Sequence, residues 1–142
     1  MLTAPDQITD AARLIQVALT PVFLLSSIGV ILGVLANRLA RVIDRARKLE
    51  DAAANGGPNA AEAVRVLGRR ADLIYRSITF ATVAAIAVAF VVVLLFADTF
   101  LGIGLSPVIA TVFVLAILSL AVGLLIFLVE VRVATASLRI GR

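Results

Sequence analysis

A line of polar residues runs along an otherwise apolar stretch near the start of the chain. Gln16, Thr20 and Ser27 are separated by four and seven residues, which places them on one face of a helix. Asn37 and Arg41 continue this line toward the next charged segment. If several copies of the chain form a ring, these five residues are candidates to line a pore. In the alternative, structural interpretation the hydroxyl groups bond to their own helix or to its neighbours.

Small residues form a second line on the same stretch. Gly29 and Gly33 are four residues apart, and Ala36 follows seven residues after Gly29. Such a face lets helix backbones approach closely in lipid, either within one chain or between copies.

Pro21 removes one helical hydrogen bond, so it is either a structural kink or a gating hinge.

Charged residues stand where the apolar stretches end. Arg38, Arg41 and Arg76 are candidates to contact anionic lipid headgroups. The alternatives are a solvated face with helical ion pairs, or a docking site for an anion or a partner. Glu130 ends the last apolar stretch, and we expect it to pair with a residue at the level of Arg38 and Arg76. The alternatives for Glu130 are a solvated interfacial carboxylate and a relay for protons or cations.

The residue types that are missing exclude much enzyme chemistry. The chain has no cysteine and no histidine. Zinc sites, thiol nucleophiles, catalytic triads and disulfides built from those residues are therefore excluded. A few hydroxyl groups, isolated carboxylates and the single Lys48 make no acid–base set in a cleft. We expect neither an enzyme nor a metal site nor a cofactor.

The composition indicates a protein that lives in lipid. Hydrophobic residues make up 62% of the 142, and the mean hydropathy is +1.13. Ordinary soluble domains contain about 45–50% of such residues. Three stretches carry no charge: 14–37, 77–97 and 99–129. A helix needs about 20 apolar residues to cross a bilayer. In lipid a single apolar segment can pair all its backbone N–H and C=O groups only as a helix.

These stretches predict three transmembrane helices, over residues 14–36, 80–97 and 107–129. The last uncharged stretch is too long for one span, and Gly102 and Gly104 interrupt it. Ser106 and Pro107 then resemble a helix start. Residues 98–106 are thus expected to form a turn, in which Asp98 is a cap, a solvated residue or part of a charged ring in an oligomer.

The distribution of basic residues predicts the orientation. Segment 37–79 holds nine lysines and arginines, and segment 130–142 holds Arg132, Arg139 and Arg142. The remaining segments hold only Arg13. Because basic flanks stay in the cytoplasm, residues 1–13 and the turn are expected outside and both basic segments inside. Residues 1–13 have a net negative charge and the apolar run is long, so we expect no cleaved signal peptide.

The segment 37–79 is expected to be a helical hairpin. Residues 55–59, Asn-Gly-Gly-Pro-Asn, predict its turn. Each half of the hairpin has an apolar seam with alternating spacings of four and three, which is typical of an antiparallel coiled coil. The seam residues are Leu35, Leu39, Val42, Ala46, Leu49 and Ala53 on the first half, and Ala60, Val64, Leu67, Ala71, Ile74 and Ile78 on the second. No glycine or proline interrupts residues 34–54, so the first span and the first half of the hairpin could be one helix over 14–54.

Several short sequences resemble those of a known family. They are Pro21–Leu25, the Asn-Arg-Leu-Ala-Arg stretch that begins Asn37–Arg47, Arg69-Arg70 with Ile74 and Arg76–Thr79, and Glu130–Arg132 with Ser137–Arg139. Together they resemble a family of small bacterial membrane proteins classed as a domain of unknown function. The likeness covers nearly the whole chain, and Asn-Arg-Leu-Ala-Arg is its most distinctive part. It implies a bacterial, three-span inner-membrane protein and supplies no activity or catalytic residue.

The sequence therefore predicts an all-α membrane protein with three transmembrane helices and a cytoplasmic coiled-coil hairpin, assembled as a homo-oligomer. Two functions compete. The first is a non-conducting scaffold or regulatory protein whose hairpin docks a cytoplasmic or membrane partner. The second is an oligomeric channel with the first helix nearest the axis. Anionic membrane lipid is an expected partner. Nucleic acid is not, because topology accounts for the basic charge.

Overall fold

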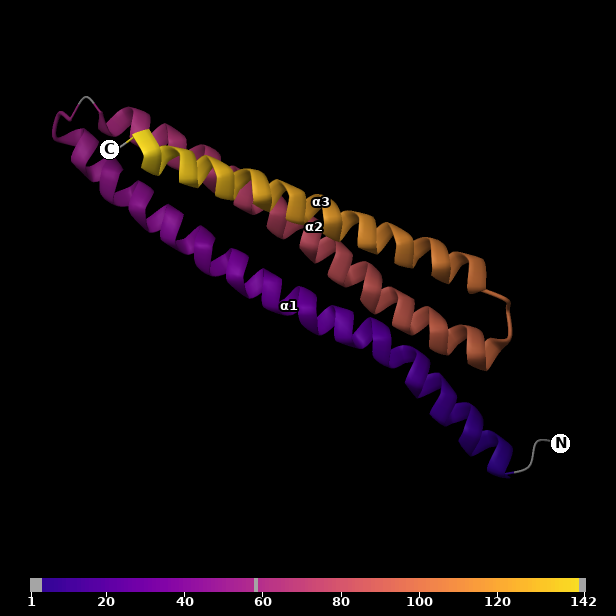
Figure 1. The fold of residues 1–142 in the computed structure, drawn as a ribbon. Coiled ribbons are helices and arrows are strands. Elements are labelled where there is room, and N and C mark those ends of the chain that lie inside the picture. Colours follow the sequence, from indigo (N-terminus) through magenta and orange to yellow (C-terminus); the bar gives the residue numbers. More distant parts are fainter. Residues whose placement is uncertain (1–3, 58, 141–142) are drawn as a thin grey trace.

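Three long helices make up the structure, a computed structural model that describes residues 4–57 and 59–140. They are α1 (Ala4–Ala54), α2 (Ala60–Leu101) and α3 (Ser106–Ile140). Consecutive helices run antiparallel, so the turn between α1 and α2 lies at the same end as the C-terminus (Figure 1). The described part contains no strand. Arg142 and Pro58, which the sequence analysis placed in the basic tail and the turn, lie outside the described residues.

All three helices are long and apolar enough to cross a membrane. At 1.5 Å per residue their lengths are about 75, 63 and 52 Å, against about 30 Å of hydrocarbon in a bilayer. Each helix is therefore longer than the hydrocarbon core is thick, so part of each helix must lie outside that core. α1 begins inside the segment expected to precede the first span and continues through Pro21 without interruption. α3 likewise extends through most of the predicted tail, 130–142.

The loop between α2 and α3 is shorter than the predicted turn over 98–106. α2 continues to Leu101, and Gly102 ends it with the left-handed φ of 61° that glycine adopts without strain. The N–H of Gly102 donates to the carbonyl of Asp98 at 2.8 Å, and the N–H of Leu105 donates to the Asp98 carboxylate at 2.8 Å. Asp98 thus satisfies backbone groups on both sides of the loop.

α2 is the central helix, with α1 and α3 packed against it. In the apolar part, Ile28 of α1, Ala84 and Val88 of α2 and Ala116 of α3 are buried in one cluster. A second cluster joins the predicted seams of α1 and α2, with Leu35 and Val42 from one and Leu67 and Ile74 from the other. Within the described residues the backbones of α1 and α3 make no close approach, so only side chains can connect these two helices.

Gly123 sets the distance between α2 and α3. A Cβ atom added to Gly123 would lie 3.2 Å from the Cβ of Phe80 and 3.2 Å from the carbonyl oxygen of Ser77. The Ser119 hydroxyl donates to the Phe80 carbonyl at 2.8 Å one turn away. Close helix approach through a small residue is the packing mode available in lipid, where helix association has no hydrophobic driving force. Gly29 and Gly33, which the sequence analysis proposed for this role, have open space around them in the single chain.

Gly123→Val should destabilise the fold, because the added methyl groups force α2 and α3 apart. Overpacking of this kind costs about 1–3 kcal/mol. Gly68→Val is the control, since it adds the same side chain to an exposed position of α2 where nothing lies within 4 Å. The thermal unfolding midpoint in detergent micelles should fall for Gly123→Val and change little for Gly68→Val. Equal losses for the two variants would show that α2 and α3 do not meet at Gly123.

Candidate functional site

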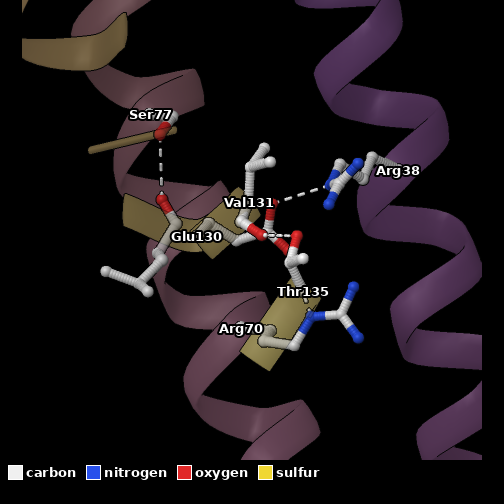
Figure 2. Close-up of polar contacts among 7 residues, drawn as sticks. Arg38, Arg70, Ser77, Glu130, Val131 and Thr135 are labelled. Atoms are coloured by element: carbon white, nitrogen blue, oxygen red, sulfur yellow. Dashed lines mark hydrogen bonds and ion pairs between the residues drawn. The ribbon is translucent and has the colours of Figure 1, made fainter. Parts of the chain in front are cut away.

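Three charged residues meet where the apolar parts of the helices end. Arg38 follows the first uncharged stretch on α1, Glu130 follows the last one on α3, and Arg70 lies on α2. The antiparallel order brings these three positions to the same level along the bundle (Figure 2). The close-up shows both arginines directed toward the Glu130 carboxylate from opposite helices.

Glu130 is fully buried and holds one arginine with each carboxylate oxygen. The Nε of Arg38 donates to Oε2 at 2.7 Å, and the Nε of Arg70 donates to Oε1 at 3.1 Å. The exposed fraction is 0% for the Glu130 side chain, 32% for Arg38 and 16% for Arg70. The Arg38 guanidinium also lies 5.5 Å from the ring centroid of Phe127, one turn before Glu130 on α3. That distance permits a cation–π contact. We refer to Arg38, Arg70 and Glu130 as the charge cluster.

The charge cluster links the two helices whose backbones stay apart. A buried carboxylate costs several kcal/mol in lost hydration unless it is paired and hydrogen-bonded. Glu130 escapes this cost only while α1 and α2 both hold their arginines against α3. The arrangement therefore favours a single packing of three helices over packings in which either arginine is displaced.

The remaining polar groups near the cluster bond to their own helices. Ser77 is buried, and its hydroxyl donates to the Leu73 carbonyl at 3.1 Å. The Thr135 hydroxyl donates to the Val131 carbonyl at 2.9 Å (Figure 2). No buried side-chain nitrogen or oxygen of the described residues lacks a hydrogen-bond partner. Residues 4–57 and 59–140 also hold no group of three or more His, Cys, Asp or Glu residues that could bind a metal ion.

Of the four predicted headgroup or ion-pair residues, the structure brings two together. Arg38 and Glu130 form an ion pair, as the sequence analysis anticipated. Arg76 instead pairs with Asp72 at 3.1 Å on its own helix, with both side chains more than half exposed. Arg41 is exposed and makes no ion pair with a described residue.

Arg70, the third member of the cluster, was not among the predicted residues. Depth along the helices favours Arg76, because Arg76 lies at the level of Arg38. Six residues turn an α-helix by about 600°, so Arg70 and Arg76 lie on sides of α2 about 120° apart. The apolar seam of α2 could have indicated Arg70. Arg70 lies three residues after Leu67 and four residues before Ile74, at the edge of that seam.

The predicted pore-lining residues occupy an open flank of α1. Gln16, Thr20, Ser27, Asn37 and Arg41 are all exposed. Gln16 and Thr20 border a cavity of about 670 Å³ that α1 forms with α2 and α3. The Ser27 hydroxyl donates to the Phe23 carbonyl at 3.0 Å, which satisfies it without water or a neighbouring helix. The predicted packing residues Gly29, Gly33 and Ala36 are exposed as well.

Glu130→Gln should destabilise the protein strongly, because it leaves two partly buried guanidinium groups without a carboxylate. Removing one partner of a buried ion pair costs on the order of 3 kcal/mol. Asp72→Asn is the matched control, since it also breaks an arginine–carboxylate pair, but an exposed one worth at most about 1 kcal/mol. Thermal unfolding in micelles measures both. A Glu130→Gln variant as stable as Asp72→Asn would mean that the cluster does not hold the helices together.

Comparisons with known proteins place the chain in a family. No curated protein and no solved structure matches it. A family model described as a protein of unknown function (DUF2721) matches residues 18–140. The match includes all of the charge cluster and most of each helix. The chain therefore belongs to the DUF2721 family of proteins of unknown function.

Proposed function

We propose that this protein is a non-enzymatic, non-conducting scaffold or regulatory protein of the bacterial inner membrane. Residues 37–79, which we call the arm, would project into the cytoplasm and dock a protein partner there. The N-terminus and the loop between α2 and α3 would lie outside, and α3 would end in the cytoplasm. The concentration of basic residues on the arm supports this orientation.

One observation carries the proposal: the arm is fixed to the apolar part of the protein by the charge cluster at its base. α1 and α2 each run from the apolar part into the arm as one helix. Glu130 adds α3 to this junction. Leu35 and Val42 of one seam and Leu67 and Ile74 of the other are buried in one cluster, which supports a coiled-coil arm. A stiff extension of this kind suits a docking platform better than a catalytic cleft.

The competing proposal is an oligomeric pore lined by α1. Its support is the exposed polar flank of that helix. The hydrogen bond of the Ser27 hydroxyl argues against a pore, because that hydroxyl already donates to a carbonyl of its own helix. A homo-oligomer is compatible with both proposals, and the exposed Gly29 and Gly33 would permit close contact between copies.

The orientation can be tested with single cysteines, because the natural chain has none. In intact cells with a permeable outer envelope, a membrane-impermeant maleimide should label Ile103→Cys and leave Asn55→Cys unlabelled. Inverted membrane vesicles should give the opposite pattern. Ile103 is 60% exposed and lies in the loop between α2 and α3. Labelling of Asn55→Cys from outside would contradict the proposed orientation.

Partner docking can be tested by photo-crosslinking in living cells. A photoreactive amino acid at Ile43 of the arm, which is 38% exposed, should give a discrete adduct with a second protein. The same amino acid at Val93, which is 61% exposed on the apolar part of α2, is the control and should give none. Purified protein should also stay silent in planar bilayers. Adducts containing only this chain, together with ion conductance that changes in Gln16→Leu, would favour the pore instead.

A further inference from the structure

An arginine-lined groove lies between α1 and α2 beside the charge cluster. Its volume is about 460 Å³. Asn37 and four arginines, Arg38, Arg41, Arg45 and Arg70, line it, and no carboxylate does. Three apolar residues complete its wall: Val34, Val42 and Leu67. We refer to this cavity as the arginine groove.

The arginine groove has an excess of positive charge that the protein does not neutralise. Glu130 balances one of the four arginines, and it is buried outside the lining of the groove. Arg41 and Arg45 have no carboxylate of a described residue within ion-pair distance. Four guanidinium groups against one carboxylate leave a net charge of +3. Like charges that line one groove repel one another, so an anion in the groove would lower the energy of the folded chain.

The donors that remain free match a phosphate group. An arginine has five N–H donors, and Arg38 and Arg70 each use the Nε donor for Glu130. Their Nη groups have no hydrogen-bond acceptor among residues 4–57 and 59–140. Glu130 thereby orients both guanidinium groups and leaves their Nη donors available for a ligand. Planar forks bind phosphate oxygens in pairs, which distinguishes arginine from lysine at such sites.

The position of the groove indicates a lipid as the source of that phosphate. Val34 belongs to the uncharged stretch of α1, and Arg38 is the first charge after it. The groove thus begins at the depth where the apolar span gives way to charged side chains, which is where phospholipid headgroups lie. Val34 at one end would contact an acyl chain or glycerol backbone, whereas the arginines hold the headgroup.

We propose that the arginine groove is a binding site for a phosphate anion, with the headgroup of an anionic phospholipid as its ligand. Arg41 and Arg45 supply binding charge, and Arg38 and Arg70 are held in position by Glu130. The site does not depend on a protein partner of the arm, so its test is separate from that of the proposed function.

The test is native mass spectrometry of the full chain released from detergent micelles, titrated with phosphatidylglycerol. Phosphatidylcholine, which has a phosphate and no net charge, is titrated in parallel. We expect one retained phosphatidylglycerol per chain and weaker retention of phosphatidylcholine. The Arg41→Gln/Arg45→Gln double variant should bind phosphatidylglycerol roughly tenfold or more weakly, because each arginine near a membrane surface contributes about a fivefold factor.

The control is Arg65→Gln/Arg69→Gln, which removes the same charge from exposed arm positions that do not line the groove. It should change the affinity less than twofold. Equal weakening by the two double variants, or no weakening by either, would overturn the site. Competition by inorganic phosphate at a concentration equal to the lipid would support the phosphate site and assign free phosphate as its ligand.

A folding check keeps the result interpretable. Arg41 and Arg45 make no ion pair with a described residue, so their loss should leave the helical circular dichroism unchanged. In addition, phosphatidylglycerol should raise the thermal unfolding midpoint of the natural chain more than that of Arg45→Gln alone. An equal rise in both proteins would contradict the role of the groove.

Discussion

The burial of one carboxylate constrains the whole structure. Glu130 follows the long uncharged stretch of α3 and is removed from solvent, so its charge must be neutralised by side chains from elsewhere. Arg38 and Arg70 meet this requirement from two other helices. α1 and α3 have no close backbone contact of their own within the described residues. Packing against α2 positions both helices, and the ion pairs of Glu130 add a direct link between α3 and α1.

The lengths of the helices determine where the charge cluster lies along the bundle. Because each helix exceeds the thickness of a bilayer core, the cluster lies partway along the bundle, with an apolar part on one side and the arm on the other. The packing surfaces on the two sides differ. The apolar part uses small residues and the close approach at Gly123, whereas the arm uses leucine, isoleucine and valine seams. The charge cluster lies between these two packing regions and adds a direct contact from α3 to α1.

Much of this fold could be predicted from the sequence, because charge spacing and apolar periodicity act locally. The uncharged stretches predict three apolar helices, and the seam residues Leu35, Val42, Leu67 and Ile74 are indeed buried together. Depth along the helices predicts only that Glu130 pairs with a residue at the level of Arg38 and Arg76, and the structure shows Arg38 in that role. Arg70 could not be found in this way, because its role depends on how α2 is rotated about its axis. Gly123 was missed for a similar reason: only the docked position of α3 distinguishes it from Gly29.

A double-mutant cycle between Arg70 and Glu130 tests the central claim most directly. Unfolding free energies of Arg70→Gln, Glu130→Gln and the double variant should be non-additive, with a coupling of at least about 1 kcal/mol. The same cycle between Arg76 and Glu130 is the reference, and it should be additive because Arg76 pairs with Asp72. Additivity within about 0.5 kcal/mol for Arg70 and Glu130 would contradict the account, because the two residues would then not act on each other.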